Sequence, residues 1–216
     1  MTINSKNDYF KIDLHTHCIE GSDCSKVSVS ETINKLRKIG YNGVLLTDHQ
    51  NINSYRYYHE HYENSDFLVL CGLEYWTSLG HMLLILPEPE EIFNKPFIDP
   101  IKLINFVHQK DGIIGIAHMF HPTYPFAAEL LHSDKLEKII ELSDFIEVEN
   151  GAVPEDKNIM ALEIAEKYNK AMTSGSDSHS LEDVGKTATI IKRTISNEKD
   201  LISAIRNKEI IKPDLK

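Results

Sequence analysis

The chain has 216 residues, 41% of them hydrophobic and 26% charged, which is ordinary for a globular protein, and we predict a single domain over 1–216. A formal net charge of −10 offers no basic surface for the phosphates of duplex nucleic acid, so we expect no duplex partner. Because the start is polar and no apolar run approaches the length of a membrane span, we expect a cytoplasmic protein without a membrane partner.

Short apolar runs alternate with helical patterns along the chain. Apolar runs predict strands over 9–13, 43–46, 67–73, 82–86, 113–117, 145–148, 171–173 and 188–191. Helices are predicted over 31–39, 53–63, 100–110, 136–142, 155–168 and 198–206, with Ser28 or Ser30 capping the first. This repeated order is typical of a parallel α/β sheet or barrel.

The first predicted strand runs into His15-Thr16-His17. In an extended backbone, side chains two residues apart point to the same face, so these two imidazoles converge. Convergent histidines followed by a carboxylate, here Asp23, suit a borderline divalent metal ion. Taken alone, such a pair is equally common among ordinary surface or hydrogen-bonded histidines.

Further His, Asp and Glu residues follow the predicted strand ends. They are Asp48 with His49, Glu74, His118, Glu149, and Asp177 with His179. The C-terminal ends of strands are where α/β sheets and barrels build their sites. Singly, an Asp-His pair can cap a loop and a lone histidine can belong to the core, but together these residues predict one metal site.

The chain has three cysteines, an odd number, which argues against a disulfide framework and favours a reducing compartment. Cys18 and Cys24 flank the first His motif without a Cys-x-x-Cys spacing. We interpret both as small packing residues, with metal binding as the alternative.

Five segments, in this order, resemble the successive motifs of the PHP (polymerase and histidinol phosphatase) family of metal-dependent phosphoesterases. They are Asp13-Leu14-His15-Thr16-His17, Thr47-Asp48-His49, Gly72-Leu73-Glu74, Ile116-Ala117-His118 and Gly175-Ser176-Asp177-Ser178-His179, and the resemblance spans residues 11–189. It implies a distorted (β/α)7 TIM-like barrel with two or three divalent metal ions at its C-terminal mouth. Zinc, manganese and iron all accept mixed histidine and carboxylate ligands.

The resemblance also implies which side chains hold the ions. His15, His17, Glu74 and Asp177 would bind one ion, and Glu74 would bridge to a second ion, bound also by His118 and His81. Asp23, His49 and His179 would bind the third. Two departures from the family pattern leave alternatives: a longer loop after His17 admits Glu20 in place of Asp23, and His121 competes with His118.

The charges of this ligand set favour an anionic substrate. Three divalent ions on six neutral histidines and three carboxylates leave a site of about +2 once a hydroxide binds, which balances a phosphate monoester. The chain lacks a Gly-x-Ser-x-Gly elbow and a Walker-type loop. We therefore expect a phosphoesterase that hydrolyses a small phosphomonoester, a nucleotide or metabolite phosphate, by metal-activated water.

Besides Glu74, two side chains are predicted to have catalytic roles. Asp48 would orient a neighbouring ligand, and His121 would protonate the leaving oxygen. Glu149 and Asn150 are candidates to contact metal-bound water or substrate. We assign no physiological substrate and no oligomeric state from the sequence. Two alternative functions stay open: an exonuclease that trims short oligonucleotides with the same cluster, and a metal-binding regulatory protein with little turnover.

Overall fold

The computed structural model describes residues 9–62, 66–92, 96–126 and 133–215, so the last residue of the helix predicted over 53–63 lies outside the described residues. The strands are β1 (Phe10–Thr16), β2 (Gly43–Leu46), β3 (Leu68–Cys71), β4 (Leu73–Thr77), β5 (Gly80–Ile85), β6 (Ile113–Ile116), β7 (Phe145–Asn150), β8 (Ala171–Gly175) and β9 (Thr189–Ile191). The helices are α1 (Val29–Lys38), α2 (Asn53–His61), α3 (Pro100–Gln109), α4 (Asp134–Leu142), α5 (Glu155–Lys167) and α6 (Glu198–Arg206). The predicted elements are confirmed with small shifts at their ends; the predicted strand 67–73 corresponds to β3, and β4, which begins at Leu73, was not predicted.

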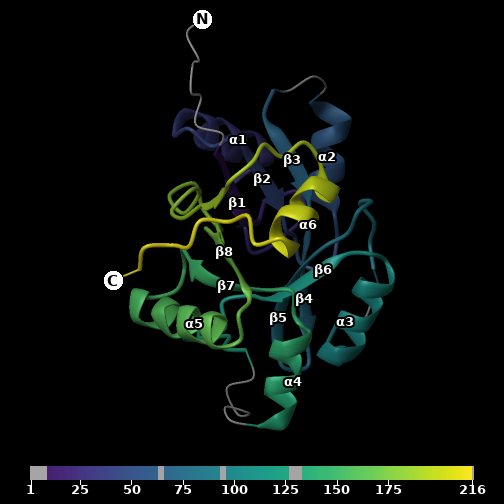
Figure 1. Cartoon of the computed structure of the whole chain (residues 1–216). Helices are drawn as coiled ribbons and strands as arrows, with labels where there is room; N and C mark the ends of the chain where they lie inside the picture. The colour runs from purple at the N-terminus through teal and green to yellow at the C-terminus, as the bar shows by residue number, and fades with distance from the viewer. Residues whose placement is uncertain (1–8, 63–65, 93–95, 127–132, 216) are drawn as a thin grey trace, which may run out of the picture.

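The described strands form two sheets (Figure 1), in the orders β3-β2-β1-β9 and β4-β5-β6-β7-β8. Strand neighbours are antiparallel in β1–β9, β4–β5 and β5–β6, and parallel elsewhere. Isolated bridges join the two sheets at Thr16 with Ser178 and at His49 with Glu74. The sheets therefore meet beside the segments that carry the predicted site residues.

The prediction of a mixed α/β fold is confirmed, but that of a distorted (β/α)7 barrel is not, because the described strands form two sheets. Between Leu68 and Ile85, β3, β4 and β5 follow one another without helices, and β3 and β4, which are joined directly at Gly72, belong to different sheets. A short turn between consecutive strands makes them antiparallel, whereas parallel neighbours need a long crossover. Glu74 and His81 consequently lie inside the paired strands β4 and β5, not beyond the end of a strand.

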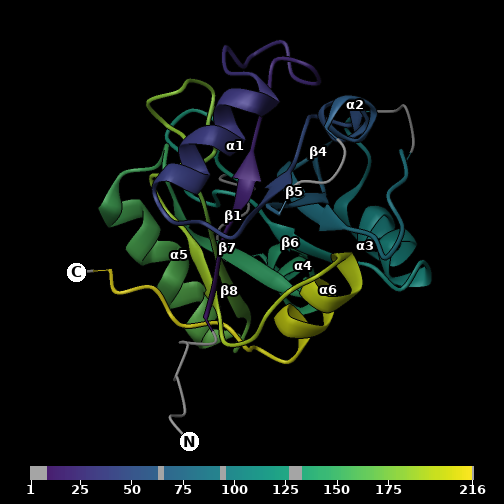
Figure 2. The same cartoon turned by 90° about the horizontal axis from the view of Figure 1, so that it is seen from above.

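Helices surround the strands, as Figure 2 shows from above. One buried apolar cluster joins both sheets to α6, through residues that include Leu14, Leu83, Phe145 and Leu201. A second cluster packs α3, α4 and α5 against the five-stranded sheet, and a third packs α1 and α2 against β2 and β3. Burial of these apolar faces is the main force that holds the strand ends in place. No helix in the described ranges has the length and apolarity needed to cross a membrane.

Candidate metal centre

Glu74 is buried in the middle of a group of histidines. Its Oε1 lies 2.8 Å from Nε2 of His118 and 2.9 Å from Nδ1 of His81. Its Oε2 lies 3.0 Å from Nδ1 of His49 and 3.3 Å from Nε2 of His17. One carboxylate therefore contacts four imidazoles that come from four separate segments of the chain.

Asp177, which follows β8, makes a second set of contacts with the histidines of the first motif. Its Oδ1 lies 3.5 Å from Nε2 of His15 and 3.3 Å from Nε2 of His17, while His15 Nε2 is also 3.5 Å from Glu74 Oε1. The ligand atoms of His15, His17 and Asp177 lie within 4.8 Å of one another, as do those of His15, Glu74 and His118. Asp177 has a φ of 50° and His118 a φ of 25°, a left-handed conformation that is uncommon outside glycine and that clusters at functional sites.

Glu147, on β7, is a buried acid at this site that the sequence reasoning missed. Its Oε1 accepts a hydrogen bond from His15 Nδ1 at 2.9 Å, and its Oε2 accepts one from the backbone N–H of His118 at 2.8 Å. Because Nδ1 of His15 carries the proton, its Nε2 offers a lone pair to a metal ion. The sequence contains one sign of this residue, because an acidic side chain inside the apolar run Phe-Ile-Glu-Val is unusual and indicates a buried partner.

The two residues proposed at the end of β7 differ in where they lie. Asn150 Nδ2 donates to Glu147 Oε2 at 3.0 Å and to Asp177 Oδ2 at 3.2 Å, so it holds both carboxylates. Glu149 is half-buried and lies opposite Ser174 of β8 instead. A register shift between Glu147 and Glu149 separates the two acids, which strict alternation along the strand would place on one face.

Asp48 contacts His17 through Ser22. The Ser22 hydroxyl donates to Asp48 Oδ1 at 2.9 Å, and its oxygen lies 3.3 Å from His17 Nδ1. Asp48 Oδ2 accepts a hydrogen bond from the backbone N–H of Ser54 at 2.9 Å. A Cβ at Gly21 would lie only 1.8 Å from Asp48 Oδ2, so glycine is needed there. The orienting role of Asp48 stays a prediction, and Ser22 is the contact through which it would act on His17.

A third group of ligand atoms within 4.8 Å of one another belongs to His17, Cys24, His49 and His179. Asp23, the oxygen ligand expected here, is exposed and lies outside the three groups. The alternative, Glu20, accepts hydrogen bonds from the backbone N–H of Val29 at 3.1 and 3.2 Å, at the start of α1. The sequence favours packing for Cys24, whereas the fold brings its sulfur to the histidines.

His121 lies at the edge of the histidine cluster. Its ring centroid is 5.3 Å from that of His118 and 5.5 Å from that of Tyr124. Nδ1 accepts hydrogen bonds from the backbone N–H groups of Thr123 and Tyr124, both at 3.1 Å, so the proton of the neutral ring lies on Nε2. Of the two competing histidines, the structure brings His118 to Glu74.

The cavity over the cluster has a volume of about 930 Å³. Its lining includes Glu74 and Asp177 together with the aromatic side chains of Trp76, Phe97 and Tyr124. Trp76 and Tyr124 both stack with the ring of His81, at centroid distances of 5.8 and 6.0 Å. This volume is in the range of about 300–1,000 Å³ typical of small-molecule sites.

Carboxylates and histidines of the cluster shift each other's pKa values. Burial acts to raise the pKa of Glu74, but His15 and His118 hold it well below its usual range. Burial acts to lower the pKa of His15, but Asp177 and Glu147 raise it well above 6.5. The pKa of His49 is raised to about 10, because hydrogen bonds with Cys24 and Glu74 outweigh the effect of burial, which lowers it. The cluster therefore attracts positive charge, and metal ions compete with protons for it.

The donor set fits divalent metal ions. Glu74, Glu147 and Asp177 are all buried around His15, and buried negative charge is costly unless cations or hydrogen bonds compensate it. Imidazole nitrogen and carboxylate oxygen are the ligands of zinc, manganese and iron. The cysteine sulfur of the third group favours zinc among these ions.

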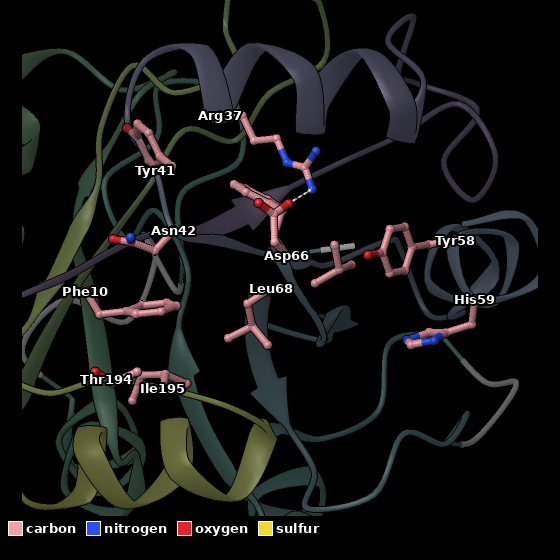
Figure 3. Close-up of a pocket in the computed structure, with 12 residues that line it drawn as sticks. Phe10, Arg37, Tyr41, Asn42, Tyr58, His59, Asp66, Leu68, Thr194 and Ile195 are labelled. Atoms are coloured by element: carbon pink, nitrogen blue, oxygen red, sulfur yellow. Dashed lines mark hydrogen bonds and ion pairs between the residues drawn. The ribbon is translucent and has the colours of Figure 1, made fainter. Parts of the chain in front are cut away.

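A second hollow lies between α1, α2 and the segment before α6, as Figure 3 shows. Its volume is about 740 Å³, and its lining includes Phe10, Leu68 and Ile195. Arg37 and Asp66, also in its lining, pair with each other at 2.6 Å. None of the predicted site residues lines this hollow, so the candidate site is the cavity over Glu74.

Comparisons with known proteins agree with this geometry. Residues 155–210 match a family model described as PHP-associated, PHP_C. The structure of PsfC from Pseudomonas syringae PB-5123 has a TM-score of 0.73 and 14% identity, over 92% of this chain and 90% of that one. A two-domain protein from Bacteroides vulgatus, containing a predicted PHP-like metal-dependent phosphoesterase, has a TM-score of 0.71 and 15% identity over 94% and 64%. No curated protein sequence matches the chain.

Endonuclease Q is also similar in structure, with a TM-score of 0.71 and 18% identity over 92% of this chain and 57% of that one. It was solved with a 27-mer duplex substrate that has an abasic lesion at the active site. A protein with this fold thus binds duplex DNA, so the fold does not support our expectation of no duplex partner. That expectation depends on the net charge of −10 alone.

Proposed function

From the match of residues 155–210 to a PHP-associated family model and from the fold, we propose that this chain is a PHP-type phosphoesterase that hydrolyses a small phosphomonoester by metal-activated water. The observation that carries the proposal is the position of Glu74, whose two carboxylate oxygens are each within 3.3 Å of two imidazoles. A carboxylate shared in this way can bridge two metal ions.

The ligand roles follow from the contacts of each side chain. We propose that His15, His17, Glu74 and Asp177 hold one ion, and that Glu74, His81 and His118 hold a second. His49 and His179 contribute to a third. When bound, two or three such ions lower the pKa of water and polarise a phosphoryl oxygen.

The remaining residues of the cluster orient the ligands and the substrate. Glu147 fixes the tautomer of His15, and Asp48 acts on His17 through Ser22. The Nε2–H of His121 is free of the backbone contacts that occupy Nδ1, so it can donate to the leaving oxygen of the substrate. Glu74, Asp48 and His121 are therefore the residues for which we propose catalytic or positioning roles.

Two features support a small substrate. The cavity volume of about 930 Å³ accommodates a mononucleotide or metabolite phosphate. The aromatic side chains of Trp76, Phe97 and Tyr124 line the cavity and can contact a flat apolar group. The same aromatic lining, with the similarity to Endonuclease Q, favours the alternative of an exonuclease that trims short oligonucleotides.

A phosphate-release assay on metal-loaded protein tests the proposal. The double variant His15→Ala/His17→Ala should lose both bound metal and turnover, whereas the matched variant His59→Ala/His61→Ala, on the exposed face of α2, should keep both. Turnover in the first variant equal to that of the unaltered chain would refute the assignment.

Three substrates separate the candidate functions. A phosphomonoesterase should release phosphate from a mononucleotide or a sugar phosphate and leave a trinucleotide without a terminal phosphate intact. An exonuclease should shorten the trinucleotide. Tight binding of phosphate to the metal-loaded protein, without turnover of any substrate under several divalent ions, would instead favour the metal-binding regulatory protein.

A further inference from the structure

Cys24 is the one sulfur ligand atom in the three groups of metal-binding side chains that the described residues form. Its Sγ and the ligand nitrogens of His17, His49 and His179 all lie within 4.8 Å of one another. Ligand atoms at about 2.0–2.3 Å from a single tetrahedral ion are separated by distances within this limit. The group is therefore compact enough for one ion.

The backbone on both sides of Cys24 is held in place by hydrogen bonds. On one side, the backbone N–H of Ser22 donates to Cys18 O at 2.8 Å. On the other, the Ser25 hydroxyl donates to His17 O at 3.0 Å, and Lys26 N–H donates to His179 O at 2.8 Å. The loop is thus attached to two of the histidines that Cys24 faces, which makes the position of its thiol a property of the fold.

The two oxygen ligands expected from the sequence are directed elsewhere. Asp23 and Cys24 are both exposed, but only Cys24 belongs to the group, and both carboxylate oxygens of Glu20 accept hydrogen bonds from Val29 N–H. His179 Nδ1 donates to Asp177 O at 2.9 Å, which leaves its Nε2 lone pair available to a metal ion. His17 is assigned to the first ion, so the imidazoles of His49 and His179 and the Cys24 thiolate remain, a set of nitrogen and sulfur donors that zinc accepts.

We propose that Cys24 is a thiolate ligand, with His49 and His179, of the third metal position, and that this position takes zinc in preference to manganese. The inference rests on the proposed metal cluster and identifies the chemistry of one of its positions. On binding, the thiol proton passes to solvent and a sulfur lone pair forms the bond to the ion. The other two positions have only nitrogen and oxygen donors, so the sulfur makes the third chemically distinct.

Cobalt(II) provides the test, because it replaces zinc and shows a thiolate-to-cobalt charge-transfer absorption in the near ultraviolet in addition to its visible bands. The unaltered protein titrated with cobalt should show both absorptions. Cys24→Ser should lose the charge-transfer absorption and keep the visible bands of the remaining ions, while Asp23→Asn, at the neighbouring exposed residue, should keep both. Circular dichroism establishes that each variant is folded.

A second measurement uses the unaltered protein and needs no variant. Zinc should slow the alkylation of Cys24 by iodoacetamide at least ~10-fold, because a coordinated thiolate is a poor nucleophile. Mass spectrometry of the labelled peptide measures the rate of alkylation. The buried Cys18 and Cys71 serve as internal references. Alkylation of Cys24 at the same rate with and without zinc would overturn the inference.

The outcomes separate this inference from the function on which it rests. Cobalt that binds the unaltered protein without a charge-transfer absorption, or an absorption that persists in Cys24→Ser, would overturn the thiolate ligand and leave the phosphoesterase proposal standing. Failure of the unaltered protein to bind any cobalt would overturn both together.

Discussion

Glu147 accepts a hydrogen bond at 2.9 Å from Nδ1 of His15, and the other nitrogen of that ring faces Glu74 and Asp177. The two residues are 132 positions apart, and the contact joins β1 of one sheet to β7 of the other. A partner of this kind sets the tautomer and the direction of a metal-binding histidine.

Replacing Glu147 should weaken metal binding without removing a proposed ligand. Glu147→Gln keeps one oxygen acceptor but loses the negative charge and one of the two acceptor sites used by His15 and His118. We expect metal affinity and kcat/KM to fall about 10–100-fold, as outer partners of metal ligands usually do. Equilibrium dialysis and phosphate release measure the two effects. The control is Glu149→Gln on the same strand, and equal losses in the two variants would contradict the role of Glu147.

Stability of the metal-free protein should fall as the pH rises above neutrality. The pKa of His49 is raised from 6.5 to about 10, so its protonated form stabilises the fold below about pH 6.5 and this contribution is lost as the pH rises toward 10. The raised pKa values of His15 and His118 act in the same direction. Cys24 opposes them between about pH 6 and 9, because its pKa is lowered from 9.0 to about 6 by hydrogen bonds that outweigh burial.

Thermal unfolding followed by circular dichroism, with chelator present, measures this dependence between pH 6.5 and 10. With zinc in place of chelator the decrease should be smaller, because the ion replaces the protons that are lost. His49→Gln in chelator should also show a smaller decrease than the unaltered protein. A melting temperature that increases steadily with pH in chelator would show that the histidines are not protonated in the metal-free fold.

Tyr124 tests whether the aromatic lining binds a base. Its side chain is 61% exposed and stacks with His121 and His81, so Tyr124→Ala should leave the bound metal unchanged. Stacking of a base on an aromatic ring is worth about 1–3 kcal/mol, so the KM for a mononucleotide should rise about tenfold. The KM for a sugar phosphate should change little, which gives the control within the same variant. Equal changes for both substrates would argue against base stacking at Tyr124.

Gly21 tests the position of Asp48. The Cβ of Gly21→Ala would overlap Asp48 Oδ2, which is held by hydrogen bonds from Ser54 N–H to Oδ2 and from Ser22 to Oδ1. We expect a loss of about 1–3 kcal/mol in the free energy of unfolding, as overpacking usually costs, and weaker metal binding through His17. Urea unfolding and metal titration measure the two. A variant as stable as the unaltered chain, with full metal content, would show that Asp48 is not held in this way.

The histidines and acids of the site were largely predictable from the chain itself. Their residue types restrict the chemistry to metal binding, and their places at or near strand ends indicated that they would meet. His15, His17, Glu74, His118 and Asp177 are indeed brought together, along with His49, His81 and His179. The order of strands and helices followed from local apolar patterns, which depend on residues close in sequence.

Three features needed the tertiary structure. Glu147 looks like an ordinary strand residue until His15, from the other sheet, lies beside it. The loop after His17 could direct Glu20, Asp23 or Cys24 toward the histidines. Hydrogen bonds of Ser25 to His17 and of Lys26 to His179 hold the loop so that the sulfur of Cys24 lies beside them. The described strands form two sheets, so the predicted (β/α)7 barrel is not shown; β3 and β4, which are joined directly at Gly72, belong to different sheets.

The sequence alone determined the mixed α/β fold class and the histidine and carboxylate character of the site, since these depend on the composition of short segments. Only the tertiary structure decided which of several neighbouring side chains faces the cluster. The physical reason is that loop conformation and strand register are set by hydrogen bonds and packing between residues far apart in the chain, and a shift of one residue turns a different side chain toward the site.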